Sequence, residues 1–337
     1  MSKINHQNKQ LVHTFHQEMN QAIAEKKDLK PILDHYCAAD MVWNGSKPFD
    51  DLHGTEAWNS TFWQPLIDAF PDLENRPYIF MSGSFKGCDW VCSTGNLIGT
   101  FENNWLDIPA NNQSVWIRYG SFYEVKDGKI LRGYCILDML DVMRQAGIHL
   151  FPNRAPEILI PAPMTGDGVL LEQTDPAESQ QSLQLVEDMI AGLMQFDGKN
   201  IATMGMTRFW SQNMMWYGPA GTGSTRGLKG FEKYHQIPFL KGFSDRKGGN
   251  HVARFGDAKY TCSTGWPSIY ATHNGDDWMG IAATNKKITM RVMDWWRRED
   301  NLLVENWVFI DKIDLLHQFG IDVFEKMRAQ LSEAKVK

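Results

Sequence analysis

The sequence contains one long pattern twice, and this duplication limits what the chain can fold into. When the 337-residue sequence is shifted by 173 residues, identical residues coincide along most of the pattern. The matched pairs include Trp43 with Trp216, Gly45 with Gly218, Phe70 with Phe243, Trp105 with Trp278, Arg118 with Arg291, and Asp138 with Asp311. A repeat of this length corresponds to a whole domain, so we expect two domains of the same kind.

One inner segment repeats at a different spacing. Cys92-Ser93-Thr94-Gly95 corresponds to Cys262-Ser263-Thr264-Gly265, which is three residues closer than the rest of the pattern. Because loops tolerate insertions, we expect the second copy to regain these three residues in a loop over residues 272–277.

The repeat and the proline content predict the domain boundaries. We expect a first domain over residues 1–151 and a second over residues 179–325, each large enough to bury its own core. A proline-rich linker over residues 152–178 joins them, and residues 326–337 form a polar tail.

Composition and charge exclude several classes of protein. The net charge is -6 and the basic residues are scattered, so we expect no nucleic-acid partner. No apolar run approaches the roughly 20 residues that span a bilayer, and the polar start has no apolar signal core, so we expect no membrane partner and a cytoplasmic location. The odd number of cysteines, five, fits a reducing compartment, and their spacing predicts no metal site.

Helices are expected at the start of each copy. Apolar residues recur every four positions from Leu11 to Ile23, a second short helix begins at Pro31, and a third runs over residues 55–70. We expect Thr55 to cap this third helix and Pro65 to bend or break it. The second copy repeats the order from residue 183 onward.

Strands are expected to follow the helices. Residues 78–81, 90–98, 115–125 and 130–138 are rich in β-forming residues, and Asp127-Gly128 is a strong hairpin signal. Residues 138–147 predict a short helix that ends at Gly147. Helices followed by an antiparallel sheet, in both copies, predict an α+β fold.

These residues resemble the SnoaL-like polyketide cyclases, or ester cyclases, of the nuclear transport factor 2-like superfamily. The motifs that carry the resemblance are Ala69-Phe70-Pro71-Asp72-Leu73, Asp127-Gly128-Lys129-Ile130, and Leu315-Leu316-His317-Gln318-Phe319-Gly320. The resemblance implies two tandem cone-shaped domains, each a curved antiparallel sheet wrapped around helices with an apolar pocket open at one end.

The resemblance also implies catalytic residues. Cyclases of this family use an aspartate at the end of the last strand as general acid/base and need no cofactor or metal; the matching residues are Asp138 and Asp311. A carboxylate near an activated carbon can remove its proton and return it to the new alkoxide, as aldol cyclisation requires. The alternative is that each aspartate caps the helix that follows it.

Alternation along the last strand identifies further candidates. Tyr134 lies on the same face as Asp138, and Trp307 on the same face as Asp311. Arg118 and Arg291 are matched cations within apolar strands, which suits a ligand carbonyl or carboxylate, although pairing across the sheet is an alternative. Trp43 and Trp216 fit either a pocket wall or a core.

We therefore expect each domain to bind a small apolar or carbonyl-rich molecule. The leading hypothesis is an enzyme of the cofactor-free cyclase, isomerase or lyase type. The alternative is a non-catalytic binding protein in which one or both pockets are degenerate. Two cones in one chain also predict an intrachain pseudo-dimer, and a homodimer is a further alternative.

Overall fold

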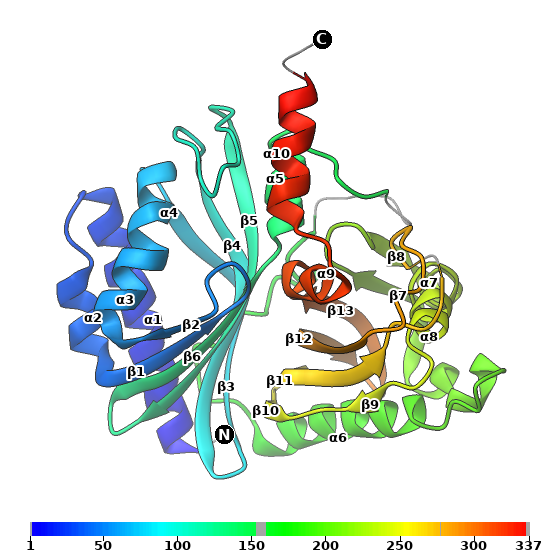
Figure 1. Ribbon diagram of the computed structural model, residues 1–337. Coiled ribbons are helices and arrows are strands. Elements are labelled where there is room, and N and C mark those ends of the chain that lie inside the picture. The colour runs from blue at the N-terminus through cyan, green and yellow to red at the C-terminus, as the bar shows by residue number, and fades with distance from the viewer. Residues whose placement is uncertain (1, 153–159, 277, 335–337) are drawn as a thin grey trace. The chain divides into compact units, whose positions relative to one another are not determined.

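The computed structural model describes residues 2–152, 160–276 and 278–334 (Figure 1). Contacts divide the chain into two compact units. The first unit comprises Ser2–Ser82, Gly87–Leu150 and Asp311–Lys337, and the second comprises Gly83–Lys86 and Phe151–Ile310. This division concerns contacts, so the domain boundaries predicted from the repeat stay a prediction. Parts of the predicted linker, tail and loop, at 153–159, 335–337 and 277, lie outside the described residues.

A six-stranded sheet with the order β2-β1-β6-β5-β4-β3 forms the centre of the first unit. Its strands are β1 (Cys37–Gly45), β2 (Asp51–His53), β3 (Glu74–Phe85), β4 (Cys88–Thr100), β5 (Ser114–Lys126) and β6 (Lys129–Leu137). β1 runs parallel to β6, while β4, β5 and β6 are antiparallel neighbours. The predicted strands and the Asp127-Gly128 turn are confirmed, since both turn residues have positive φ.

Helices of the first unit precede and follow the sheet. They are α1 (Lys3–Ala24), α2 (Lys30–Tyr36), α3 (Gly54–Trp58), α4 (Gln64–Ala69) and α5 (Met139–Gln145), with α9 (Lys312–Phe319) and α10 (Val323–Ala334) at the C-terminus. The predicted helix at 138–147 is confirmed, and Gly147 ends it with positive φ. Within this unit α9 packs against α5, and Arg328 of α10 forms an ion pair of 3.0 Å with Asp107.

The predicted third helix exists, but the predicted cap is wrong. A π-helical turn, η1 (Asn59–Trp63), joins α3 to α4, and Pro65 lies in the first turn of α4, where a proline without an N–H interrupts the regular α-helical bonding. Thr55 lies inside α3 and its hydroxyl donates a hydrogen bond to Asp34, while His53 occupies the N-cap position. The Thr55 hydroxyl therefore bonds to Asp34 of α2 and does not cap the start of α3, as we had expected from the sequence.

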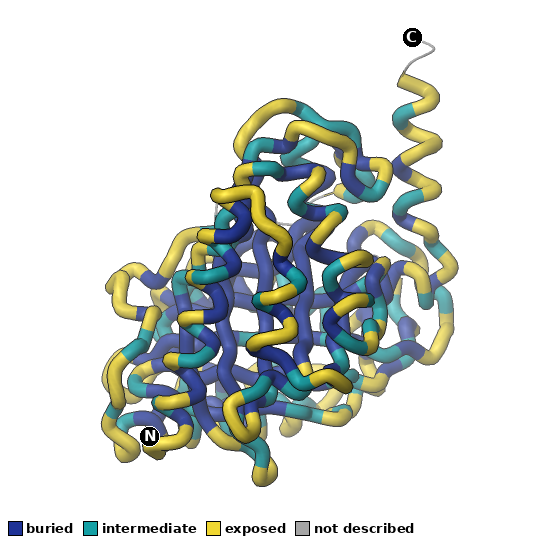
Figure 2. Tube along the Cα trace, turned by 90° about the vertical axis from the view of Figure 1, so that its left-hand side faces the viewer, coloured by how far each residue is buried: buried dark blue, intermediate teal, exposed yellow. Residues whose placement is uncertain are grey.

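Aromatic side chains fill the interior of the first unit. The Trp43 ring packs against Trp58 and Phe62, with centroids 5.9 and 4.6 Å away, and all three side chains are buried. In Figure 2 the buried positions run through the strands, and the exposed positions lie on the outer helices and turns. The core therefore lies between the sheet and the helices that cover it.

The sheet of the second unit repeats this arrangement. Its path is β10-β11-β12-β13-β7-β8, with β9 paired to β11. The strands are β7 (Trp210–Tyr217), β8 (Ser224–Arg226), β9 (Lys247–Gly248), β10 (His251–Asp257), β11 (Tyr260–Thr272), β12 (Lys287–Glu299) and β13 (Leu302–Ile310). Its helical elements are α6 (Pro176–Leu193), η2 (Ile201–Met204), η3 (Met206–Arg208), α7 (Gly227–Phe231), η4 (Glu232–Gln236) and α8 (Ile237–Gly242).

The segment before α6 is fastened to the outer face of this second sheet. The Trp307 indole N–H donates to the Pro161 carbonyl oxygen at 3.0 Å, and the Met164 amide donates to the buried Glu305 carboxylate at 3.3 Å. The Tyr260 hydroxyl donates to Asp167 at 2.6 Å. Residues 161–167 therefore cover side chains that a free tether would leave in solvent.

The change of spacing within the repeat has a different origin from the one expected. Between the same two pairing positions, β11 contains two more residues than β4, and they form a bulge at Trp266–Ser268 opposite β12. The bulge accounts for two of the three residues, and the second copy regains the third after Thr272. The expectation of a change confined to the loop is wrong, because a proline without an N–H is tolerated at a bulge within a strand.

Candidate functional site

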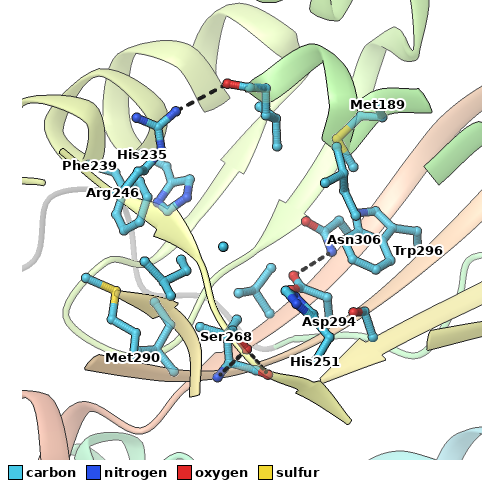
Figure 3. A pocket seen from close by; sticks show the side chains of 18 of the residues that line it. Met189, His235, Phe239, Arg246, His251, Ser268, Met290, Asp294, Trp296 and Asn306 are labelled. Atoms are coloured by element: carbon cyan, nitrogen blue, oxygen red, sulfur yellow. Dashed lines mark hydrogen bonds between the residues drawn. The ribbon is translucent and has the colours of Figure 1, made fainter. Parts of the chain in front are cut away.

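A cavity of about 250 Å³ lies inside the second unit, between the sheet and the helices that cover it (Figure 3). Its walls come from α6, from strand β7, from the segment α7 to α8, and from strands β9 to β13. The residues that give the cavity its chemical character are Trp216, His235, Phe239, Arg246, Arg254, Ser263, Ser268, Asp294, Asn306 and Val308.

Strand alternation explains which side chains form the floor of the cavity. Met290, Val292, Asp294 and Trp296 are alternate residues of β12, so they point to the same face of the sheet. The neighbouring strand β13 contributes Asn306, Val308 and Ile310 by the same alternation. Asp294 is the acidic side chain among the described lining residues.

Strand register brings three polar side chains into one row across the sheet. Arg254 of β10 pairs with Ser263 of β11, and Ser263 pairs with Asp294 of β12. The Arg254 Nε donates to the Ser263 Oγ at 3.2 Å, so its guanidinium extends along this row towards Asp294. A cation, a hydroxyl and a carboxylate thus face the same cavity.

The pKa of the Asp294 carboxyl is raised towards neutrality. Burial raises the pKa of Asp294 to about 7, while a hydrogen bond from Asn306 and the charge of Arg254 oppose this rise. The Asn306 Nδ2 donates to the Asp294 Oδ1 over a long 3.5 Å and to the Trp295 carbonyl oxygen at 3.0 Å (Figure 3). A carboxyl with this pKa can both accept and return a proton near pH 7.

The bulge in β11 adds a further polar group to the cavity wall. The Ser268 hydroxyl donates to the carbonyl oxygens of Gly265 and Val292, both at 3.1 Å, and accepts a hydrogen bond from the Val292 amide. These bonds satisfy the backbone at the bulge, so Ser268 serves the shape of the cavity.

Trp216 lies in the cavity wall. Its ring stacks on His235 with centroids 3.9 Å apart, and it also packs against Phe231. Gly218 allows this position, because a Cβ there would lie 2.2 Å from the Trp216 ring. Burial, with Arg254 nearby, lowers the pKa of another lining residue, His251, to about 4, so that imidazole is neutral at pH 7.

The first unit has no carboxylate at the position of Asp294. Ser121 of β5 pairs with Ser93 of β4, as Asp294 pairs with Ser263, and the two serine hydroxyls lie 3.0 Å apart. In the same unit the Phe15 ring packs against His16, Trp58 and Tyr123, with centroids 5.7, 6.3 and 6.3 Å away. The two copies therefore share a sheet but differ in the chemistry of its inner face.

The predicted catalytic residue Asp138 forms a buried ion pair. It follows β6 at the N-cap of α5, its side chain gives α5 no capping hydrogen bond, and its Oδ2 lies 3.7 Å from Arg118 Nη1. Both side chains are almost fully buried. The structure thus brings together Arg118 and Asp138, one predicted pair of binding and catalytic residues.

The other predicted catalytic residue, Asp311, has the bonding pattern of a helix cap. Its Oδ1 accepts a hydrogen bond from the Asp314 amide at the start of α9, and its Oδ2 accepts one from the Lys47 amide at 3.1 Å. Helix capping was the alternative role that we expected for both aspartates. The structure shows a capping hydrogen bond from the side chain of Asp311 but not from that of Asp138.

The remaining predicted binding residues lie outside the lining of the cavity. Arg291 lies over the Trp266 ring at 4.6 Å, on the face of β12 opposite Asp294, and Trp307 lies on the face of β13 opposite Asn306. Tyr134 packs against Trp90, and Trp43 belongs to the aromatic core of the first unit. Their predicted roles, and those of Asp138 and Asp311, stay predictions.

Asp294 and Arg254 were not among the residues predicted from the sequence. The available signal was the alternation of Met290, Val292, Asp294 and Trp296, which puts one carboxylate into an apolar strand face. Asp294 has no identical partner in the first copy, so a search for matched residues passed over it.

The chain belongs to the SnoaL-like polyketide cyclase family, whose family model matches residues 14–146 and 199–319. The α+β fold with two SnoaL-like segments is therefore confirmed. No curated protein matches the sequence significantly. Among the described residues, no helix has the length and apolar character needed to cross a membrane.

Three solved structures each match 42% of this chain. A protein described as a SnoaL-like polyketide cyclase, from Jannaschia sp. CCS1, is 20% identical over 42% of this chain and 93% of its own, with a TM-score of 0.34. AclR from Streptomyces galilaeus, described as a hydroxylase, is 20% identical over 42% and 97%, with a TM-score of 0.34. A protein from Xanthomonas campestris pv. campestris, described as a polyketide cyclase, is 22% identical over 42% and 98%, with a TM-score of 0.33.

Proposed function

We propose that the second unit binds a small carbonyl-containing molecule in its cavity and that Asp294 transfers a proton at the carbon next to the carbonyl group. Aldol cyclisation and isomerisation both begin with this step, and it needs no cofactor. The observation that supports the proposal is a carboxyl with a pKa of about 7 on the floor of an otherwise largely apolar cavity.

The proposed reaction divides the work among the residues around the cavity. The Asp294 carboxylate removes the proton, and the same group then returns it to carbon or to the new alkoxide. The Arg254 guanidinium stabilises the negative charge that develops on the carbonyl oxygen, which is the kind of electrostatic help that enzymes use most. Trp216 and Phe239 hold the apolar body of the substrate, so that it reacts from a fixed position.

The size of the cavity limits the substrate. At about 250 Å³ it is smaller than the roughly 300–1,000 Å³ of sites for drug-sized ligands. We therefore expect a substrate, or the reacting part of one, of about two fused rings.

Asp138 and Asp311 remain candidates for the same chemistry, as the family resemblance implies. The buried pair of Asp138 with Arg118 supports the first of them, since it places a carboxylate beside a cation away from solvent. In Asp311 both carboxylate oxygens accept backbone hydrogen bonds, which favours a structural role.

The test uses 2-tetralone, a two-ring ketone with acidic protons next to its carbonyl group. Deuterium incorporation in D₂O is followed by proton NMR with wild type, Asp294→Asn, Asp138→Asn and Asp311→Asn. We expect Asp294→Asn to slow the protein-dependent exchange by roughly 10²–10⁴-fold, the usual contribution of a general base, while the other two variants retain it.

A blank without protein gives the background rate, and thermal unfolding shows that each variant is folded at the assay temperature. An Asp294→Asn protein that exchanges as fast as wild type would refute the assignment. Loss in Asp138→Asn alone would move the chemistry to the first unit. Wild type no faster than the blank would favour the alternative of a binding protein.

A further inference from the structure

Two arginines enter the cavity of the second unit from different elements. Arg246 lies between α8 and β9, and Arg254 is on β10. In Figure 3, Arg246 lies with His235 and Phe239 on one side of the open space, and Asp294 and Asn306 lie on the other. A ligand in the cavity therefore has a cation at one end and the carboxyl at the other.

Neither arginine is neutralised by an ion pair in the part of the chain that the structure describes. One Nη of Arg246 donates to the Leu193 carbonyl oxygen at 3.4 Å, at the end of α6, and Arg254 uses its Nε on Ser263. A guanidinium has five N–H donors, so most donors of both side chains have no hydrogen-bond acceptor within the described residues. Burial lowers the pKa of both, but both stay charged at neutral pH.

Both arginines are half-buried, and a partly desolvated cation without a carboxylate partner is unfavourable unless something else balances it. Lys247 adds a third positive charge at the edge of the cavity, and Asp294, with its pKa of about 7, supplies at most one negative charge. Glu187 attracts Arg254 from outside the lining, without an ion-pair contact. The lining of the cavity is therefore positive in net charge.

The position of Arg246 is specific to the second copy. Asp245 binds the amide of Thr272 at 2.7 Å and its hydroxyl at 2.7 Å, and Asp72 makes the same two bonds to Thr100 in the first unit. These matching bonds identify equivalent positions. The residue after Asp72 is Leu73, a buried core residue, whereas the residue after Asp245 is Arg246.

We propose that the natural ligand of this cavity is an anion, a carboxylate or an equally acidic group attached to a compact apolar ring system, with Arg246 as its anchor and Arg254, in the row with Asp294, left for the reacting carbonyl group. A planar guanidinium fits a carboxylate through two parallel hydrogen bonds, which makes arginine suited to this group. The proposal deepens the proposed function, because it fixes the orientation in which the ring system would meet Asp294.

Calorimetric titration measures this binding without any reaction. The probes are 2-naphthoate and its neutral isostere 2-naphthamide, which have the same ring system and nearly the same shape. We expect wild type to bind the carboxylate at least about tenfold more tightly than the amide. Arg246→Gln should weaken 2-naphthoate binding several-fold and lose the preference for the carboxylate, whereas Arg254→Gln should keep this preference.

Arg226→Gln is the matched control, since Arg226 is exposed and is not among the lining residues. It should keep the wild-type preference. Equal affinity of wild type for both probes, no binding of either, or a preference that survives in Arg246→Gln would each overturn the proposal. The comparison of the two probes on wild type holds even if a variant fails to fold.

Asp294→Asn separates this proposal from the proposed function. This variant should bind 2-naphthoate at least as tightly as wild type, because it removes a negative charge from the cavity. Tight carboxylate binding together with unchanged 2-tetralone exchange in Asp294→Asn would sink the catalytic role and leave the anion site standing. If Asp294→Asn loses 2-tetralone exchange while wild type shows no preference for the carboxylate probe, the catalytic role stands and the anion site is refuted.

Discussion

Asp294 occupies the sheet position in the second copy that Ser121 occupies in the first. Each residue lies opposite a serine of the neighbouring strand, Ser263 for Asp294 and Ser93 for Ser121. The backbone pairing is the same, so the difference between the copies lies in one side chain and in what surrounds it. Ser121 lies in a hydrogen-bonded row of the Ser93 and Tyr119 hydroxyls, whereas Asp294 lines a cavity.

The raised pKa of Asp294 should make the stability of the protein depend on pH. The folded chain holds this proton up to about pH 7, whereas an unfolded aspartate releases it near its ordinary pKa of 3.8. The unfolded state therefore binds fewer protons between about pH 4 and 7, and stability falls as the pH rises through this range. Asp294→Asn removes the effect, so it should be more stable than wild type at pH 8 by on the order of 1–3 kcal/mol, with little difference at pH 4.

Thermal unfolding at the two pH values measures this difference. Asp188→Asn is the control, because Asp188 is exposed on α6 and its replacement should behave alike at both pH values. A gain in Asp294→Asn that is equal at pH 4 and pH 8 would contradict the raised pKa.

The exchange of 2-tetralone should follow the ionisation of the same group. Only the carboxylate form of Asp294 accepts a proton, so the protein-dependent rate should rise with pH and level off above about pH 7. Proton NMR between pH 5 and 9, with the buffer rate subtracted, gives the profile. A rate that is already level from pH 5 upward would point to a carboxylate with an ordinary pKa, such as one on the surface.

Two equivalent glycines should respond differently in function. A Cβ on Gly45 would lie 2.3 Å from the Trp43 ring, and a Cβ on Gly218 would lie 2.2 Å from the Trp216 ring. Gly45→Ala and Gly218→Ala should each destabilise the protein by roughly 1–3 kcal/mol through overpacking. Because Trp216 lines the cavity, only Gly218→Ala should also slow 2-tetralone exchange. If Gly45→Ala and Gly218→Ala slow exchange equally, Trp216 has no role in the site.

The aspartates that follow the last strand of each copy should differ in their effect on stability. Asp138→Ala removes the carboxylate partner of the buried Arg118, and such losses cost about 3 kcal/mol or more. Asp311→Ala removes a helix cap, which costs about 1 kcal/mol. Denaturant unfolding of the two variants measures the order, and a larger loss in Asp311→Ala would reverse our interpretation of the pair.

The repeat made the fold predictable, because each element of one copy supported the same element in the other. The helix at Leu11–Ile23, the hairpin at Asp127-Gly128 and the helix end at Gly147 all follow local rules, and the structure contains them. The bulge at Trp266–Ser268 did not follow, since a sequence comparison detects extra residues but cannot tell a bulged strand from a longer loop.

The cavity was harder to predict because β13 is buried on both faces. Trp307 and Asn306 are both inaccessible, so alternation alone did not tell which face meets the helices and which meets residues 161–167. From the sequence we expected the face of Trp307 to be the inner one, whereas Asn306 and Val308 line the cavity. A charged residue with no identical partner in the other copy, such as Asp294, marks a position at which the two copies differ in function. A search for identical residues passes over such a position.

The fastening of residues 161–167 decides how the second cavity can be obtained as a separate fragment. A shortened chain begun at residue 179, where the repeat starts, would strip the acceptor from the Trp307 indole and the amide donor from Glu305. The outer face of that sheet would then be exposed to solvent, and the fragment would aggregate. This aggregation would say nothing about the function of the cavity. Excision upstream of Pro161 keeps this cover in place.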